Sequence, residues 1–383
     1  MGIYSKARVA REGRRSAFFL FAFLAFWPVR QPEEEMPKMK RFSILLIAAM
    51  LGLLLACGSQ EAKAPAKQAA SPEKAEKAAP QAPRAQPARM EIHSFQSMTL
   101  TDQQFLTGRK EGKLVTLAGE LRLPRQGKDR LPAVVLIHGS GGVVSNVLDW
   151  EQYLNAMGVA TFVVDSFTGR GIVKTVFDQS QLGLTPMIVD AYRALDVLAK
   201  HPSIDPTRIA LMGFSRGGFA ALYASLKRFQ RLQGPAGQEF AAYIPFYPSC
   251  NTVFRDDEDV VDKPIRIFIG SADDSVGVAP CRAYVKRLKA KGKDVQLTEY
   301  AGAGHYFDGR AFKTPRKIKK AQTSRKCQRA ENENGLIVNV KTKQPFTWAD
   351  PCVEYWITLA YNEKASTEAK QAAKDFITTT LKP

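Results

Sequence analysis

The pentapeptide Gly213-Phe214-Ser215-Arg216-Gly217 constrains the fold of this chain more than any other feature. It follows the apolar run 208–212 and opens the apolar stretch 218–224, which predicts a strand, a sharp turn and a helix in that order. A serine on such a turn has a strained backbone, and glycines two residues to either side avoid a collision. We therefore interpret Ser215 as a nucleophile. The alternative is an ordinary strand-to-helix turn with a solvated serine.

A serine nucleophile needs an adjacent base, because its hydroxyl is a weak nucleophile at neutral pH. Of the four histidines in the chain, only His305 lies C-terminal to Ser215. It follows the strand-like run 295–300 and a loop of small residues, which can deliver an imidazole to the serine. A nucleophile followed by an acid and then a histidine is one of the known chain orders of hydrolytic triads. We predict that His305 is the base.

The third member of such a triad is an acid, expected after a strand between Ser215 and His305. The apolar run 264–269 predicts that strand, and Gly270-Ser271-Ala272-Asp273-Asp274 follows it. A buried carboxylate there would hold the imidazole tautomer and stabilise the imidazolium. We predict Asp273 as the acid and keep Asp274 as the alternative. The other aspartate would be a solvated turn residue or the cap of the next helix.

A glycine-rich loop, His138-Gly139-Ser140-Gly141-Gly142, follows the apolar run 133–137. Glycines let backbone N–H groups approach a substrate oxygen closely. We predict an oxyanion hole made by the N–H of Arg216 and that of Ser140 or Gly141. A nucleotide-binding loop is disfavoured, because no Lys-Ser/Thr pair follows and the spacing Gly-x-Gly-x-x-Gly is absent.

Strands that alternate with helices predict a mainly parallel sheet, with the site at the carboxyl ends of its strands. Besides the strands named above, the patterns predict the following: an antiparallel strand at 115–123, a buried strand at 159–164, and helices at 188–198, 278–291 and 368–381.

From Gly112 to the C-terminus the chain resembles the dienelactone hydrolase branch of the α/β-hydrolases. The resemblance rests on four motifs: His138-Gly139-Ser140-Gly141-Gly142, Gly213-Phe214-Ser215-Arg216-Gly217-Gly218, Gly270-Ser271-Ala272-Asp273 and Ala303-Gly304-His305-Tyr306-Phe307. It implies the α/β-hydrolase fold, a mainly parallel sheet with helices on both faces, and a Ser-His-Asp triad. The acid of the family sits in a Gly-x-x-Asp turn, which favours Asp273.

Two departures limit what this resemblance implies. Dienelactone hydrolases proper use a cysteine nucleophile, where this chain has Ser215. They also carry a glutamate in the loop after the first long core strand, where this chain has the glycine-rich loop 138–142. The resemblance therefore implies the fold and the triad, but not dienelactone as the substrate.

The segment before the domain reads as an export signal. Lys40-Arg41 precede the apolar run 42–55, and Leu54-Leu55-Ala56-Cys57 ends it. This ending resembles a bacterial lipobox, in which cleavage leaves Cys57 as a lipidated N-terminus. A plain signal peptide or a short transmembrane helix is the alternative, although a span needs about 20 residues. We expect the protein in the bacterial cell envelope, lipid-anchored at Cys57 and facing the periplasm.

This interpretation divides the chain into four segments. Residues 1–38 are expected to be an over-extended N-terminus, with the true start at Met36 or Met39, although the apolar stretch 17–27 could be a first anchor. Residues 39–56 are the expected signal peptide. Residues 57–90 are rich in Ala, Pro, Lys and Gln and are expected to be a disordered tether, because they cannot bury enough apolar surface. Residues 91–383 are long enough for one α/β domain.

Four cysteines remain besides Cys57, and an even number in an oxidising compartment suggests disulfides. Cys250 and Cys281 fall at the carboxyl ends of neighbouring predicted strands, and Cys327 and Cys352 bracket a hairpin-like insert. We predict the pairs Cys250–Cys281 and Cys327–Cys352. Metal binding is the alternative, and the absence of any C-x-x-C spacing disfavours it.

Three basic features remain open to more than one interpretation. Arg170 follows the end of the strand 159–164 and is a candidate for binding a substrate carboxylate, although a salt bridge that holds its loop is favoured. The side chain of Arg216, beside the nucleophile, is open to the same two interpretations. The formal net charge of +18 alone would permit nucleic-acid binding. An exported hydrolase makes that partner improbable, and a solvated face or contact with anionic envelope surfaces is expected instead.

Together these features predict a serine hydrolase that cleaves a carboxylic ester, a lactone or a related acyl bond of a small molecule. We expect no cofactor and no metal. The alternatives are a peptidase on the same fold and a non-catalytic envelope binding protein.

Overall fold

The computed structural model describes residues 87–124 and 130–383. These residues belong to the second of the two units into which the chain divides, 77–383. Cys57 and the expected signal peptide lie outside the described residues. Within the described ranges, no helix combines the length and the apolar character that a bilayer crossing requires.

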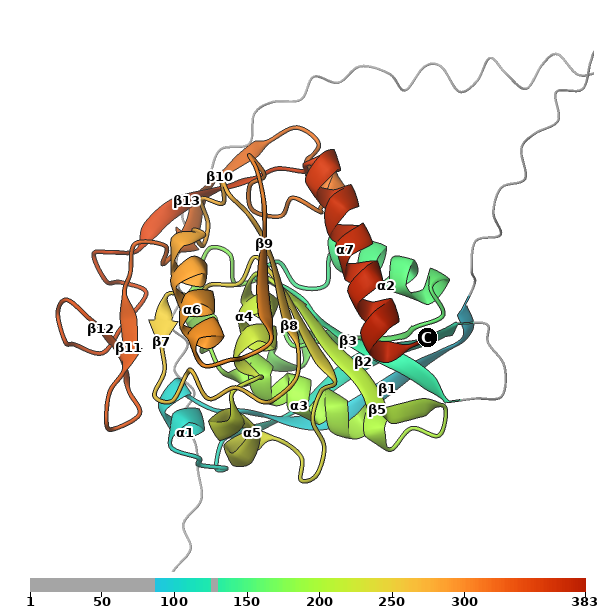
Figure 1. Cartoon of the computed structure of the whole chain (residues 1–383). Coiled ribbons are helices and arrows are strands. Elements are labelled where there is room, and N and C mark those ends of the chain that lie inside the picture. The colour runs from blue at the N-terminus through green and yellow to red at the C-terminus, as the bar shows by residue number, and fades with distance from the viewer. Residues whose placement is uncertain (1–86, 125–129) are drawn as a thin grey trace, which may run out of the picture. The chain divides into compact units, whose positions relative to one another are not determined.

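An eight-stranded sheet forms the centre of the described part of the chain, in the order β1-β2-β4-β3-β5-β6-β8-β9 (Figure 1). Its strands are β1 (Pro87–Thr99), β2 (Lys113–Pro124), β3 (Leu131–Ile137), β4 (Ala160–Asp165), β5 (Ile204–Phe214), β6 (Ala242–Phe246), β8 (Ile265–Gly270) and β9 (Val295–Tyr300). All neighbours from β4 to β9 pair in parallel, whereas β2 is antiparallel to both β1 and β4. The mainly parallel sheet and the early antiparallel strand are confirmed. β1 begins before residue 91, the expected start of the domain.

The burial of the strands follows their sequence patterns. β3 is an unbroken apolar run, and its last six residues are all buried, as expected for a central parallel strand covered on both faces. β2 alternates between exposed and buried residues over much of its length, which is typical of a strand with one face on the core.

Helices pack on both sides of the sheet. They are α1 (Asp102–Leu106), α2 (Ser145–Ala156), α3 (Pro186–Ala199), α4 (Arg216–Tyr223), α5 (Lys227–Gln233), α6 (Ala279–Ala290) and α7 (Glu363–Leu381), with short 3₁₀ turns η1 (Thr168–Arg170), η2 (Gln179–Gln181) and η3 (Arg310–Phe312). Figure 1 shows α2 and α7 on one side of the sheet and α4 and α6 on the other. The Tyr153 hydroxyl of α2 donates to the Lys370 carbonyl of α7 at 3.3 Å.

The predicted helices at 188–198 and 278–291 correspond to α3 and α6. The last helix is longer than the predicted 368–381, because it begins at Glu363. The side chain of Asn362 caps this end by accepting a hydrogen bond from the N–H of Ala365 at 2.9 Å.

Two small sheets were not predicted as such. One pairs β10 (Arg316–Thr323) with β13 (Glu354–Leu359), and the other holds β12 (Ile337–Asn339), β11 (Arg329–Glu331) and β7 (Thr252–Val253) in that order. β11 and β12 form the hairpin between Cys327 and Cys352. Both predicted disulfides, Cys250–Cys281 and Cys327–Cys352, are confirmed.

The register of the sheet brings several strand ends together. Ile137 of β3 lies opposite Gly213 of β5, and Phe214 lies opposite Phe246 of β6. The residues that follow β3, β5 and β6 therefore meet at one edge of the sheet, where the carboxyl ends of the parallel strands lie.

Candidate active site

Ser215 occupies the turn between β5 and α4 with φ 54° and ψ −110°, a left-handed backbone that a serine rarely adopts. The two predicted glycines make room for this turn. A Cβ at Gly213 would lie 2.0 Å from the carbonyl oxygen of Gly217, and one at Gly217 would lie 2.1 Å from that of Ile137. The turn is held by the N–H of Ser215, which donates to the carbonyl of Phe246 at 3.0 Å. This hydrogen bond and the close backbone packing hold the serine at the carboxyl end of β5.

The imidazole of His305 joins Ser215 to Asp273. Its Nε2 lies 2.9 Å from Oγ of Ser215, and its Nδ1 lies 2.7 Å from Oδ2 of Asp273. The His305 and Asp273 side chains are 5% and 0% exposed. A carboxylate only accepts hydrogen bonds, so Nδ1 carries the proton. Nε2 then keeps a lone pair that can accept the proton of the serine hydroxyl.

The two adjacent aspartates have different environments. Oδ1 of Asp273 accepts hydrogen bonds from the N–H groups of Ser275 at 2.8 Å and Val276 at 3.0 Å, which leaves Oδ2 for His305. Asp274 instead accepts a hydrogen bond from the N–H of Thr358 in β13. Of the two candidates, Asp273 is the one in contact with the histidine.

The loop 138–142 is held by the buried side chain of His138. Its Nε2 accepts a hydrogen bond from the N–H of Ser166 at 3.1 Å, so Nδ1 carries the proton and donates to the carbonyl of Gly139 at 2.7 Å. Burial lowers the pKa of His138, which keeps the ring neutral. The Gly139 carbonyl also accepts from the N–H of Gly142 at 3.1 Å. Sequence reasoning missed this positioning role of His138.

Residues of this loop line one cavity together with Ser215 and His305. Its volume is about 500 Å³, and Gly139, Ser140 and Gly141 form part of its wall. Arg216 follows the nucleophile as the first residue of α4. The residues predicted to form the oxyanion hole are therefore adjacent to the serine, and their role in binding an oxyanion stays a prediction.

Much of the cavity wall comes from elements that the sequence did not single out. Apolar side chains from β10 and β13 and from the preceding 3₁₀ turn contribute to it, namely Ile318, Ile357, Leu359, Ala311 and Phe312. This lining suits an apolar group next to the serine.

A buried polar network packs against the ring of His305. The ring of Tyr247 lies edge-on to that of His305, with centroids 4.7 Å apart. The Tyr247 hydroxyl donates to Oδ1 of Asp308 at 2.8 Å, and the indole N–H of Trp150 donates to Oδ2 at 2.8 Å. Burial raises the pKa of Asp308. No sequence motif marked these three residues, because they lie on separate elements.

Arg170, a candidate for binding a substrate carboxylate, instead forms the salt bridge that was favoured from the sequence. Its Nη1 and Nη2 donate to the two carboxylate oxygens of Asp190 at 2.8 Å each, and its Nε donates to Oγ1 of Thr99 at 2.8 Å. The side chain is only 4% exposed. A buried guanidinium needs a carboxylate partner, and α3 supplies one. This salt bridge ties the loop of Arg170 to α3.

One cluster of possible metal ligands occurs among the described residues, formed by Glu91, His93 and His201. Nδ1 of His201 accepts a hydrogen bond from the N–H of Ser203 at 3.2 Å, so its Nε2 carries the proton and faces Glu91 at 3.2 Å. Nε2 is then no free ligand. Glu91 also pairs with Arg89 at 2.5 Å. The cluster is a partly buried hydrogen-bonded network in which Glu91 is ion-paired with Arg89.

Comparison with known proteins identifies the family. The model of the dienelactone hydrolase family matches residues 117–381, which is more than half of the chain. The chain belongs to the dienelactone hydrolase family. It is thus a hydrolase of the dienelactone hydrolase type, with the predicted α/β-hydrolase fold.

Individual relatives of this dienelactone hydrolase family member are distant. The chain is 23% identical over 193 residues to a "Probable 2-oxo-3-(5-oxofuran-2-ylidene)propanoate lactonase" of Bradyrhizobium sp. The matched region covers 46% of this chain and 74% of the relative. The chain is 28% identical over 119 residues to protein bem46 of Schizosaccharomyces pombe, covering 31% of this chain and only 38% of that protein. A dienelactone hydrolase-like promiscuous phosphotriesterase from metagenomic libraries has a similar structure, with 16% identity, a TM-score of 0.47 and coverage of 76% and 98%.

Proposed function

We propose that this protein is a serine hydrolase that cleaves the ester or lactone bond of a small acyl substrate through Ser215, His305 and Asp273. The observation that carries the proposal is the continuous hydrogen-bonded path from Oγ of Ser215 through both ring nitrogens of His305 to Asp273. This path ends in a cavity that can hold a small molecule.

The geometry supports an acyl-enzyme mechanism. Oγ of Ser215 attacks the substrate carbonyl while Nε2 of His305 takes the hydroxyl proton, and Asp273 stabilises the imidazolium. The N–H of Arg216 and that of Ser140 or Gly141 bind the developing oxyanion. His305 then returns the proton to the departing alkoxide. Water repeats the sequence on the acyl-enzyme, which releases the acid and restores the serine.

An ester or lactone fits the lining of the cavity better than a charged peptide, because apolar side chains dominate around the nucleophile. The Bradyrhizobium relative carries the name of a lactonase, which supports a lactone among the substrates. A screen of the purified protein against panels of esters and lactones would identify the substrate.

A fluorophosphonate probe tests the proposal, because it reacts with activated serines. We expect labelling of the wild type on Ser215 and turnover of 4-nitrophenyl butyrate. Ser215→Ala should lose the label and about 10⁴–10⁶ in kcat. The fold should persist, because only a hydroxyl leaves the turn. Retained labelling and hydrolysis in a folded Ser215→Ala variant would refute the assignment.

We also propose that the protein is exported and anchored in the bacterial envelope by lipid on Cys57. The basic and apolar segments before Cys57 support this, as do the two disulfides, since such bonds persist in oxidising compartments. Metabolic labelling with a fatty-acid analogue should mark the wild type and not Cys57→Ala, which should leave the membrane fraction. A wild type without label would overturn the anchor.

A further inference from the structure

The turn that carries Asp273 is held from two sides. Its first half is attached to the large sheet, because the N–H of Ser271 donates to the carbonyl of Tyr300, the last residue of β9, at 3.0 Å. Its second half, residues 274–276, makes no hydrogen bond to that sheet within the described ranges. This second half supplies both N–H groups that bind Oδ1 of Asp273. The orientation of the carboxylate therefore depends on what holds residues 274–276 in place.

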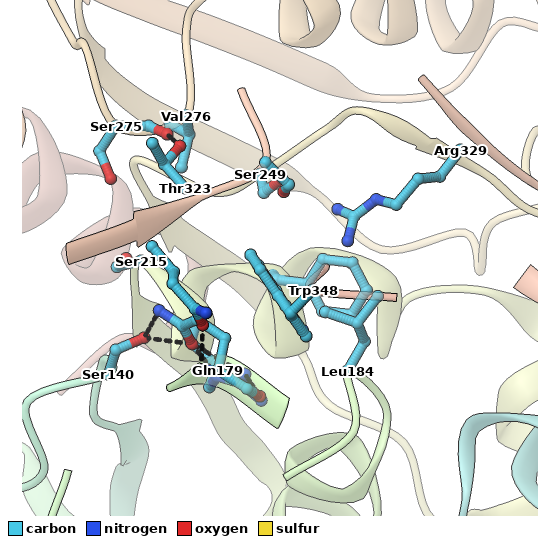
Figure 2. A pocket seen from close by; sticks show the side chains of 14 residues that line it. Ser140, Gln179, Leu184, Ser215, Ser249, Ser275, Val276, Thr323, Arg329 and Trp348 are labelled. Atoms are coloured by element: carbon cyan, nitrogen blue, oxygen red, sulfur yellow. Dashed lines mark hydrogen bonds between the residues drawn. The ribbon is translucent and has the colours of Figure 1, made fainter. Parts of the chain in front are cut away.

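The small sheet of β10 and β13 contacts this second half. The hydroxyl of Thr323, the last residue of β10, donates to the carbonyl of Ser275. Figure 2 shows Thr323 beside Ser275 and Val276. All three residues also line a second cavity, of about 70 Å³, next to Ser215. The small sheet thus reaches the acid side of the triad.

Arg325 makes the most contacts in this attachment. Its Nη1 donates to the carbonyl of Asp274 and, at 3.2 Å, to that of Trp356 in β13. Its Nε donates to the carboxylate of Glu354, and the guanidinium lies 4.0 Å from the centroid of the Trp356 ring. The side chain is only 11% exposed. One rigid, planar group therefore joins the turn to β13.

β13 continues from the turn to the histidine. The N–H of Thr358 donates to Oδ1 of Asp274 at 2.8 Å, and the N–H of Ala360, just beyond the strand, donates to the carbonyl of His305 at 3.3 Å. A parallel bridge also joins the two segments at this point. Alternate residues of a strand share one orientation, so one edge of this segment contacts both groups. Its position therefore affects the alignment of Asp273 with His305.

We propose that Arg325 is a positioning residue for catalysis. It holds the second half of the turn on β13, so that Asp273 keeps the orientation in which it stabilises the imidazolium of His305. A misplacement of about 1 Å near the reacting groups can cost about 10²-fold in rate. Arg325 lines neither cavity, so it acts on the rate through Asp273 and not through the substrate. This inference rests on the proposed hydrolysis at Ser215.

The test removes the side chain and follows the hydrolysis of 4-nitrophenyl butyrate. We expect Arg325→Met to lower kcat by about 10- to 100-fold and to leave KM within about threefold of the wild type, because the turn loses its attachment while the cavity keeps its lining. Arg325→Lys should recover part of kcat, since an ammonium can still donate to the carbonyl of Asp274. Thermal unfolding would verify that each variant is folded at the assay temperature.

Lys326→Met is the matched control. Nζ of Lys326 lies 2.6 Å from the other carboxylate oxygen of Glu354, so this substitution removes the same charge and a contact with the same carboxylate. Among the described residues, Lys326 makes no hydrogen bond to the turn that carries Asp273. The kcat of Lys326→Met should equal that of the wild type.

A double-mutant cycle with Asp273→Asn separates positioning from a general loosening of the fold. In the Asp273→Asn background, Arg325→Met should lower kcat by less than about threefold, since the carboxylate that it positions is gone. Thr323→Val serves the same cycle if Arg325→Met does not fold, because it removes the hydroxyl bound to Ser275 and leaves the guanidinium of Arg325 in place. Alone it should cost about 3- to 10-fold in kcat, and in Asp273→Asn almost nothing.

Three results would overturn the positioning role: an unchanged kcat in a folded Arg325→Met, an equal loss in Lys326→Met, or the same factor lost with and without Asp273→Asn. A large loss in Asp273→Asn beside normal activity in Arg325→Met would leave the proposed hydrolysis standing and refute the positioning alone. If Ser215→Ala and Asp273→Asn hydrolyse butyrate at the wild-type rate, the proposed function fails and the positioning role fails with it.

Discussion

The carboxylate of Asp274 accepts a hydrogen bond from the backbone N–H of Thr358 at 2.8 Å, while its neighbour Asp273 lies 2.7 Å from Nδ1 of His305. The two consecutive aspartates thus contact different parts of the structure. Asp273 orients the histidine, and Asp274 ties the same turn to β13.

Asparagine substitutions should separate these two roles. Asp273→Asn should lower kcat by about 10⁴, because an amide at this position stabilises the wrong imidazole tautomer. Asp274→Asn should stay within a few-fold of the wild type, since the amide oxygen can still accept the hydrogen bond from Thr358. Steady-state kinetics on 4-nitrophenyl butyrate would measure both. An inactive, folded Asp274→Asn beside an active Asp273→Asn would show that the other aspartate is the acid.

Glu151 on α2 predicts a pH dependence of stability. The residue is 1% exposed, and burial raises its pKa from 4.5 to about 7, although Arg122 lies 3.1 Å away. Between pH 4.5 and about pH 7 the folded protein therefore keeps a proton on Glu151 that the unfolded chain has lost. The stability of the fold falls as the pH rises through this range and stays at the lower value above pH 7.

Glu151→Gln should remove that loss, because an amide does not titrate. We expect the free energy of unfolding of the variant, relative to that of the wild type, to be about 1–3 kcal/mol higher at pH 8 than at pH 4.5. Urea unfolding at both pH values would measure the change. The same difference between the two proteins at both values would mean that Glu151 keeps an ordinary pKa when folded.

Arg170→Met should act on stability rather than on substrate binding. Removal of one partner leaves the carboxylate of Asp190 buried and uncompensated, which costs about 3–5 kcal/mol. The KM values for neutral and anionic esters should change in parallel in the protein that remains folded. A stable variant in which only the KM for 4-nitrophenyl hemisuccinate is raised would show that Arg170 binds substrate.

The two disulfides should have different functional effects. Cys250–Cys281 joins the segment after β6 to the start of α6, which follows the Asp273 turn, so its loss should lower the hydrolysis of all esters. Cys327–Cys352 closes the segment with β11 and β12, which holds none of the triad residues, so its loss should lower ester hydrolysis less. Each double serine variant should lose about 2–4 kcal/mol of stability. Identical kinetic profiles of the two variants would contradict this division.

The groups around the nucleophile were predictable, because each follows an apolar run that is long enough to identify as a buried strand. The runs 133–137, 208–212 and 264–269 correspond to β3, β5 and β8, and the loop 138–142, Ser215 and Asp273 follow them directly. Parallel pairing aligns the ends of such strands, so residues far apart in sequence converge.

The walls of the two cavities were not predictable in this way. β10 reads Arg-Lys-Ile-Lys-Lys-Ala-Gln-Thr and has only two buried residues, and β11 has only three residues, so neither carries a clear apolar pattern. Their position depends on pairing with distant strands. The partner of Arg170 was not predictable for a related reason, since the sequence around Arg170 does not reveal that Asp190 of another element pairs with it.

The residues of the candidate site come from two different stretches of the chain. The reacting groups come from loops of the large sheet that lie before residue 306, whereas Ile318, Arg329, Trp348 and Leu359 all come from the single contiguous stretch 310–359. A large part of the apolar wall beside the nucleophile is thus encoded in one uninterrupted block of the gene, outside the triad. Substitutions at its cavity-lining positions would change which groups fit beside the nucleophile while leaving Ser215, His305 and Asp273 in place. A relative that received this block by recombination would acquire the same stretch of apolar wall in one step.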